Sequence, residues 1–135
     1  MSTLKVNTIQ NTSGGSSSTP EQIEQGRAKV WIKMKGTGTI SIRDSFNVTS
    51  IVDNDTGEFT VNFSITFASR NYCPVVSSYN TNQGDGSWTS QYSDGTAFDS
   101  ATTDITTSKS KFVTYNSSGQ RQDNQDVNIA IFGDV

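Results

Sequence analysis

The stretch F-T-V-N-F-S-I-T-F, residues 59–67, alternates apolar and polar side chains without a break. Phenylalanine, valine and isoleucine occupy the odd positions, and threonine, asparagine and serine occupy the even ones. Successive side chains of a β-strand point to opposite faces, so this period of two is typical of a strand with one buried and one wet face. The stretch therefore predicts a half-buried strand from Phe59 to Phe67 and favours an all-β fold.

Two shorter apolar patterns precede this strand. The first begins at Ile40 and Ile42. The second carries four apolar residues, Phe46, Val48, Ile51 and Val52. Its apolar positions change parity after Val48, which predicts a bulge near Thr49 or Ser50. The D-N-D-T-G segment at 53–57 joins it to the strand that starts at Phe59, and Asn, Asp and Gly favour a hairpin turn there.

Further short strands are predicted along the rest of the chain, over residues 28–35, 73–79, 88–92, 102–107, 111–115 and 127–132. Eight or nine short strands with regular turns and almost no helix predict a small antiparallel β-sandwich or jelly-roll. Cys73 stands in an apolar patch and is expected to behave as a small core residue. The last strand is apolar on both faces near its end, so we expect it to be central or buried at a subunit contact.

The predicted strand over residues 28–35 has an apolar face and a lysine face. Lys29, Lys33 and Lys35 are expected on a solvated or edge-protecting face. Trp31 falls among them, and so large an aromatic there is either covered by a neighbouring subunit or exposed for binding. Trp31 and Phe132 are therefore the candidate residues of a subunit interface.

The N-terminal region reads as an arm followed by a linker. Leu4, Val6 and Ile9 are apolar residues in a polar start, and the Ser- and Gly-rich residues 11–18 have the composition of a flexible linker. The T-P-E-Q segment at 19–22 then predicts a short helix with a capping box, anchored by its single apolar residue, Ile23. The alternatives are a docking arm and a frayed terminus. We divide the chain into this region, residues 1–27, and a β-sandwich domain, residues 28–135.

The composition leaves little material for a core. The chain of 135 residues contains 20 Ser, 18 Thr and 11 Asn, but only 28 Leu, Ile, Val and Phe residues together. Net charge is only −3, which argues against disorder in a chain with ordered alternation. A chain so poor in core-forming residues gains from burial shared between subunits, so we expect an obligate oligomer.

Several chemistries lack the residues that they require. The chain has no histidine and one cysteine, which excludes Ser-His-Asp and Cys-His nucleophile systems and His-ligated or thiolate zinc sites. The D-N-D segment at 53–55 lacks the spacing of a calcium loop. Asp94, Asp99 and Asp104 could in principle hydrolyse a glycoside, but clustered Asp in Gly- and Ser-rich loops is usually turn chemistry. We therefore expect a protein without catalytic activity, metal or cofactor.

Charge and hydropathy also limit the partners. A mildly acidic chain without a basic stripe is not expected to bind nucleic acid. No signal peptide and no apolar run of membrane-spanning length are found, so we expect synthesis in a cytoplasm and no membrane insertion. The Asn-, Gly-, Ser- and Asp-rich residues 80–101 carry three aromatics, Trp88, Tyr92 and Phe98. These rings could stack on sugar, or they could pack at the sandwich edge or a subunit interface.

The segment G-T-G-T-I-S-I-R-D-S-F-N-V-T-S-I-V-D-N-D-T-G-E-F-T-V-N-F, residues 36–63, resembles a module of tail-fibre and other virion structural proteins of tailed bacteriophages. R-A-K-V-W-I-K-M-K-G at 27–36, N-Y-C at 71–73, N-I-A-I-F-G-D at 128–134 and the opening M-S-T-L-K-V-N-T-I-Q-N-T-S-G are similar too. The resemblance thins over residues 80–110.

This resemblance implies a homotrimeric virion protein. The expected function is a short tail fibre or fibre adaptor that docks on other virion proteins through Leu4, Val6 and Ile9. The alternatives are a capsid decoration protein that uses the same arm and a lectin-like module that binds host-surface glycan through Trp88, Tyr92 and Phe98.

Overall fold

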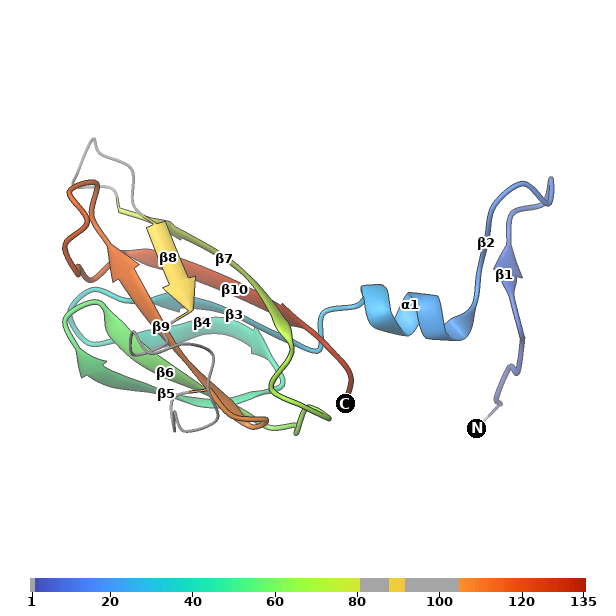
Figure 1. Ribbon diagram of the computed structural model, residues 1–135, viewed down its shortest axis with the longest axis horizontal. Helices are drawn as coiled ribbons and strands as arrows, with labels where there is room; N and C mark the ends of the chain where they lie inside the picture. The colour runs from blue at the N-terminus through green and yellow to red at the C-terminus, as the bar shows by residue number, and fades with distance from the viewer. Residues whose placement is uncertain (1, 81–87, 92–104) are drawn as a thin grey trace.

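The computed structural model describes residues 2–80, 88–91 and 105–135 (Figure 1). Two short strands and a helix come first: β1 (Ile9–Gln10), β2 (Ser17–Ser18) and α1 (Pro20–Gly26). The strands that follow are β3 (Val30–Lys35), β4 (Ser41–Phe46), β5 (Val48–Asp55), β6 (Glu58–Phe63), β7 (Cys73–Tyr79), β8 (Trp88–Gln91), β9 (Lys109–Tyr115) and β10 (Asp126–Phe132).

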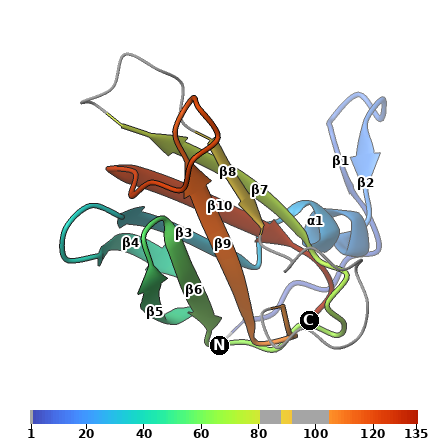
Figure 2. The same ribbon diagram turned by 60° about the vertical axis from the view of Figure 1, so that its left-hand side comes forward.

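These eight strands form a sandwich of two antiparallel sheets (Figure 2). One sheet has the order β4-β3-β10-β7, and the other has the order β5-β6-β9-β8. The predicted all-β antiparallel sandwich is therefore confirmed. The last strand, β10, pairs with β3 on one side and β7 on the other, which confirms its predicted central place.

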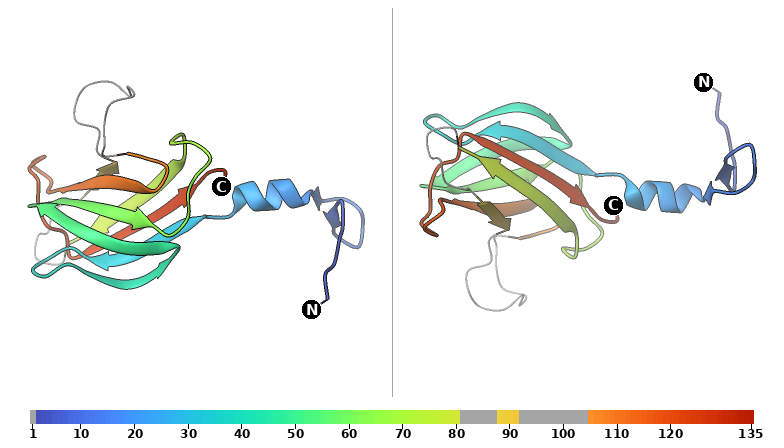
Figure 3. Two further views of the ribbon diagram at one scale, coloured as in Figure 1. Left: turned by 90° about the horizontal axis from the view of Figure 1, so that it is seen from below. Right: turned by 90° about the horizontal axis from the view of Figure 1, so that it is seen from above.

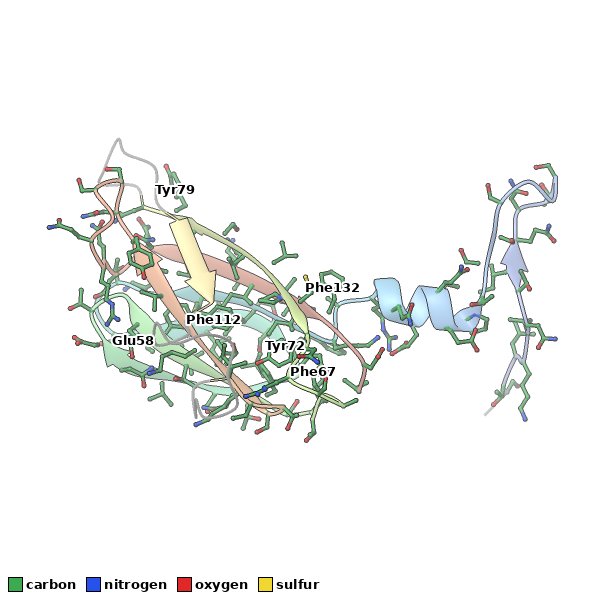
Figure 4. The ribbon with its side chains drawn as sticks, viewed as in Figure 1. Glu58, Phe67, Tyr72, Tyr79, Phe112 and Phe132 are labelled. Atoms are coloured by element: carbon green, nitrogen blue, oxygen red, sulfur yellow. The ribbon has the colours of Figure 1, made fainter. Side chains whose placement is uncertain are left out.

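The core fills the space between the inner faces of the two sheets. On β6, Phe59, Val61 and Phe63 are buried while Thr60 and Asn62 face outward, as their alternation predicts. The core cluster takes residues from both sheets: Val30, Ile32, Met34, Phe59, Val61, Phe63, Phe67, Tyr72, Ile105, Phe112, Val127, Ile129 and Ile131. At one end, the Phe67 and Tyr72 rings lie 4.7 Å apart between centroids (Figure 4). Burial raises the pKa of the Tyr72 phenol, whose hydroxyl donates to the Lys109 carbonyl at 3.1 Å.

Strand β6 ends at Phe63, four residues earlier than predicted. Ser64 turns out of the ladder, and its N–H donates to the Asn47 carbonyl at 3.0 Å. Phe67 is nevertheless buried, with 1% of its surface exposed, and its N–H donates to the Thr107 carbonyl. The apolar alternation therefore continues past the strand because the following loop also packs on the core.

The boundary between β4 and β5 also differs from the prediction. Phe46 ends β4 instead of belonging to the next strand, and Asn47 separates the two. Asn47 has a φ of 56°, a left-handed conformation that Asn tolerates better than most residues. Its side-chain amide donates to the Lys29 carbonyl at 2.7 Å, and this bond fixes the corner at which the chain passes from one sheet to the other. The predicted bulge is confirmed, since the register shifts between Val48 and Ser50.

Another predicted strand, over residues 102–107, is not found in its described part. Ile105 forms only an isolated bridge with Ser110, and the next strand begins at Lys109. Residues 102–104 lie outside the described residues. The expectation that Cys73 is a small core residue is wrong. Cys73 begins β7, and its side chain is exposed because it points to the outer face of the sheet.

The hairpin between β5 and β6 is confirmed, with its turn at Thr56 and Gly57. Gly57 is buried with a φ of 65°, and its N–H donates to a carboxylate oxygen of Asp123 at 2.6 Å. A Cβ on Gly57 would lie 2.6 Å from the Gln122 nitrogen and 2.7 Å from the Thr114 oxygen, both backbone atoms. The turn is therefore held against the segment that follows β9.

We expect Gly57→Ala to lower the free energy of unfolding by about 2–5 kcal/mol, because left-handed strain and a clash with fixed backbone add together. Gly119→Ala is the matched control. Gly119 also has a positive φ of 76°, but a Cβ there meets nothing within 4 Å. The control should lose only about 1–2 kcal/mol. Urea unfolding of both variants measures the difference, and equal losses would contradict the close contact at Gly57.

Candidate functional site: a projecting arm and an exposed sheet face

The N-terminal arm, residues 2–26, extends away from the sandwich (Figure 1). Residues 11–18, predicted as a flexible linker, instead close a small hairpin in which Ile9 pairs with Ser18 and Gln10 with Ser17. The Asn11 side-chain oxygen accepts from the Gly15 N–H at 2.9 Å, and the Gly14 N–H donates to the Asn11 carbonyl at 3.0 Å. The composition signalled flexibility, but Asn and Gly also supply this turn chemistry.

Helix α1 follows the hairpin and has the predicted capping box. The Thr19 hydroxyl accepts from the Gln22 N–H at 3.2 Å, and the Gln22 side chain accepts from the Thr19 N–H at 2.9 Å. No residue of the helix is buried, and Ile23 is 45% exposed. Ile23 therefore does not anchor the helix to the sandwich as predicted.

A buried lysine attaches the helix instead. Lys29 is only 4% exposed, and its ammonium lies 2.8 Å from the Glu24 carboxylate and also donates to the Glu24 carbonyl. This corrects the expectation that Lys29 shares a solvated face with Lys33 and Lys35. The reason is the chain direction at the start of β3, where Lys29 meets the end of α1 and its charge is neutralised by Glu24.

The predicted docking residues of the arm lie together on one surface. Leu4, Val6 and Ile9 are exposed to 85%, 40% and 55%. With Pro20 and Ile23 of the helix they line an open hollow of about 570 Å³, flanked by Lys5 and Glu21. Exposed apolar side chains gathered on one concave surface are typical of a contact site for another protein.

The second candidate surface is the outer face of the β4-β3-β10-β7 sheet. Register partners across an antiparallel pair share a face. Phe46 pairs with Trp31, Trp31 with Ala130, and Ala130 with Val75, so one apolar row crosses all four strands. Phe46 and Val75 are 45% and 58% exposed. Trp31, Ala130 and Val75 line an open hollow of about 350 Å³. We call the four residues Phe46, Trp31, Ala130 and Val75 the apolar row.

The apolar row continues toward the arm and gives way to charge in the other direction. Phe132, which pairs with Cys73, lies two residues beyond Ala130 on the same face (Figure 4). The structure thus brings the predicted interface residues Trp31 and Phe132 to one face. On the opposite side of the row, Lys33 is the register partner of Asp44 on β4 and of Asn128 on β10. Further along, Arg43 forms an ion pair with Asp126 across β3.

The outer face of the other sheet has a different character. Thr60 pairs with Lys111 on this face, and Lys111 lies 3.0 Å from the Glu58 carboxylate. Arg121 reaches the same carboxylate at 2.6 Å. Polar and charge-paired side chains suit contact with water, so the sheet that carries Trp31 is the better candidate for a contact with protein.

The aromatic candidates of residues 80–101 cannot be placed beside these surfaces. Trp88 begins β8, which confirms a short strand there. Tyr92 and Phe98, like Asp94, Asp99 and Asp104, lie outside the described residues. Their part in glycan contact or packing stays a prediction.

Two other kinds of site, a metal centre and a membrane-spanning helix, are absent from the described part of the chain. Over residues 2–80, 88–91 and 105–135, no group of three or more Cys, Asp or Glu side chains could hold a metal ion. Among the same residues, no helix has the length and apolar character needed to span a membrane. Comparison with known proteins found no matching family model, no similar curated protein and no similar solved structure.

The Glu24–Lys29 contact predicts that attachment of the arm depends on pH. The hydrogen bond from Lys29 is the largest cause that holds the pKa of Glu24 below its ordinary value, and Arg27 adds to it. A carboxyl with a lowered pKa stabilises the attached state above its ordinary pKa, and this contribution is lost as pH falls through the lowered value. We expect the amide signals of Gly26 and Arg27 in NMR spectra to shift toward disordered values in acid while those of β10 remain.

Glu24→Gln tests this reason against a control in the same helix. At neutral pH this variant should already show the Gly26 and Arg27 amide signals that the unchanged protein shows in acid. Glu21→Gln should retain the acid transition, because the lowered pKa of Glu21 comes from its own backbone and from Thr19, without Lys29. An unchanged acid transition in Glu24→Gln would show that another group attaches the helix.

Proposed function

We propose that the chain is a non-enzymatic structural protein of a tailed-phage virion, a subunit of a short fibre or fibre adaptor. In this proposal it docks on the particle through Leu4, Val6 and Ile9 and presents the sandwich outward. The observation that carries the proposal is the arm, whose apolar residues stand exposed on one hollow away from the core. The sequence resemblance to virion proteins supplies the context.

The energy of docking favours several arms acting together. Fully burying an exposed Leu, Val or Ile side chain is worth about 1.5–3 kcal/mol. Val6 and Ile9 are already partly covered, so three residues per arm provide less than about 5–9 kcal/mol. Association costs on the order of 4–15 kcal/mol, which leaves one arm weakly bound. Arms joined in one oligomer bind as a multivalent unit, and their combined affinity can exceed that of one arm by about 10²–10⁴. A homotrimer with three arms is therefore part of the proposal.

Two other placements use the same features. A capsid decoration protein would clamp the head surface through the same arm and also belongs to the virion. A lectin-like module would bind host-surface glycan through Trp88, Tyr92 and Phe98, and would not need the arm. The position of the chain in intact particles, seen by cryo-electron microscopy, separates tail from head.

The docking proposal predicts the outcome of an arm deletion. Removing residues 2–18 should leave the sandwich folded, because none of these residues is buried, and should abolish incorporation into particles. Circular dichroism checks the fold, and immunoblotting of purified particles measures incorporation. A triple change, Leu4→Ser, Val6→Ser and Ile9→Ser, should act like the deletion. The control pair Thr3→Ser and Thr8→Ser, in the same arm but outside the lining of the hollow, should be incorporated normally. Normal incorporation of the deletion would identify the arm as a frayed end.

The trimer is tested separately. We expect the isolated chain to elute as a trimer at micromolar concentration. The core contains few apolar residues, and association would bury the exposed Phe46 and Val75 of the apolar row as well. Multi-angle light scattering gives the mass directly. A folded monomer of 14.6 kDa would contradict the trimer.

A further inference from the structure

The outer face of the β4-β3-β10-β7 sheet is apolar along a line that a second copy can use. We infer that copies of this chain associate through this face around an axis parallel to the strands, so that the three apolar rows form one layer. That the number of copies is three rests on the proposed function. The choice of face rests on the register of the sheet.

The exposed residues on the two sheets distinguish this face from its opposite. Phe46, Trp31, Ala130 and Val75 lie side by side across four strands without a charge among them. The outer face of the other sheet carries the Glu58–Lys111 and Glu58–Arg121 ion pairs. The Trp31 face also carries charge, but Lys33, Asp44 and the Arg43–Asp126 pair lie beyond the apolar row at one end of the face. The row can therefore leave water, with a gain in free energy, while these ions stay at the rim.

A ring of three copies uses the whole width of the sheet. Four strands spaced about 4.8 Å apart form a face about 19 Å wide. Three such faces around one axis form a triangular prism, and the side chains of the three outer faces fill its interior.

The order of residues along the apolar row suits this prism. Trp31 and Ala130 are on the two inner strands, so the small Ala130 leaves room near the axis for the three Trp31 rings. Phe46 and Val75 are on the two edge strands, β4 and β7. In a closed ring the β4 edge of one copy meets the β7 edge of the next, which sets Phe46 against the neighbouring Val75.

The charged end of the face allows the same arrangement. Lys33 is the register partner of Asp44, and Arg43 pairs with Asp126. Opposite charges are thus already adjacent within each copy. Three copies therefore do not bring together an excess of charge of one sign at this end. This end forms the polar rim of the interface, and the apolar row forms its core.

The direction of the arm agrees with an axis along the strands. Helix α1 leaves the sandwich where β3 begins and β10 ends (Figure 3). Phe132 lies at this end of the sheet (Figure 4). A symmetry axis parallel to the strands therefore sends all three arms out of the same end. The three docking hollows would then point together at one partner surface, as multivalent docking requires.

Disulfide trapping tests the interface directly. In one copy, Phe46 and Val75 are three strand spacings apart, about 14 Å, which is too far for an internal disulfide. On oxidation, the variant Cys73→Ser/Phe46→Cys/Val75→Cys should run as a covalent trimer on a non-reducing gel. The control Cys73→Ser/Phe46→Cys/Val52→Cys should not, because Val52 lies on the outer face of the other sheet. A covalent dimer would overturn the three-fold ring, and a monomer in both variants would overturn the interface.

Two matched variants, each of which introduces one negative charge, separate this inference from the proposed function. Val75 and Val52 are both strand valines, 58% and 46% exposed, one on each outer face. Val75→Glu should turn the trimer into a folded monomer, and Val52→Glu should leave the trimer intact. A trimer that survives Val75→Glu would overturn the interface alone, whereas a monomeric wild-type chain would overturn both this interface and the trimer. Deletion of residues 2–18 should leave the trimer, and its loss would assign assembly to the arm.

Discussion

The register between β3 and β10 is the constraint on which the rest of the structure depends. Val30 faces Ile131, Ile32 faces Ile129, and Met34 faces Val127, and all six side chains are buried. Because side chains alternate along a strand, a slip of one residue would turn Trp31, Lys33 and Lys35 into the core. The same register therefore seals the inner face and sets Trp31 beside Ala130 on the outer one.

A core this small relies on well-placed polar groups as well as on apolar burial. Thr114 is 1% exposed, and its hydroxyl donates to the Gln122 carbonyl at 2.5 Å. Asn124 is completely buried, and its amide donates to the Ser78 hydroxyl at 3.0 Å. Such bonds offset the cost of burying polar groups, but they add little net stability. The exposed side chains of Phe46 and Val75 and the half-buried Trp31 are then apolar area that the single chain does not bury.

Local patterns in the sequence predicted local structure well. The alternation from Phe59, the bulge after Val48, the turn at Gly57 and the capping box at Thr19 all depend on residues close in the chain, and all are present. The contacts that were missed join distant residues. Lys29 is buried only because Glu24 meets it, and Asn47 forms a corner only because the Lys29 carbonyl accepts its amide. Of the apolar row, Trp31 was a candidate from its lysine neighbours, but Phe46 and Val75 required the register of four strands.

The two candidate surfaces, the arm and the outer face of the Trp31 sheet, lie in separate parts of the chain. Lys29 connects them, since it precedes Val30 of the central strand and also holds Glu24 of the arm helix. A helix with no buried residue has no packing of its own to set its direction, so this contact sets the angle at which the arm leaves the sheet. If copies associate through the apolar row, the same contact in each copy gives the arms a common direction. Lys29 therefore links the sheet that carries the apolar row to the direction of the arm, although it belongs to neither surface.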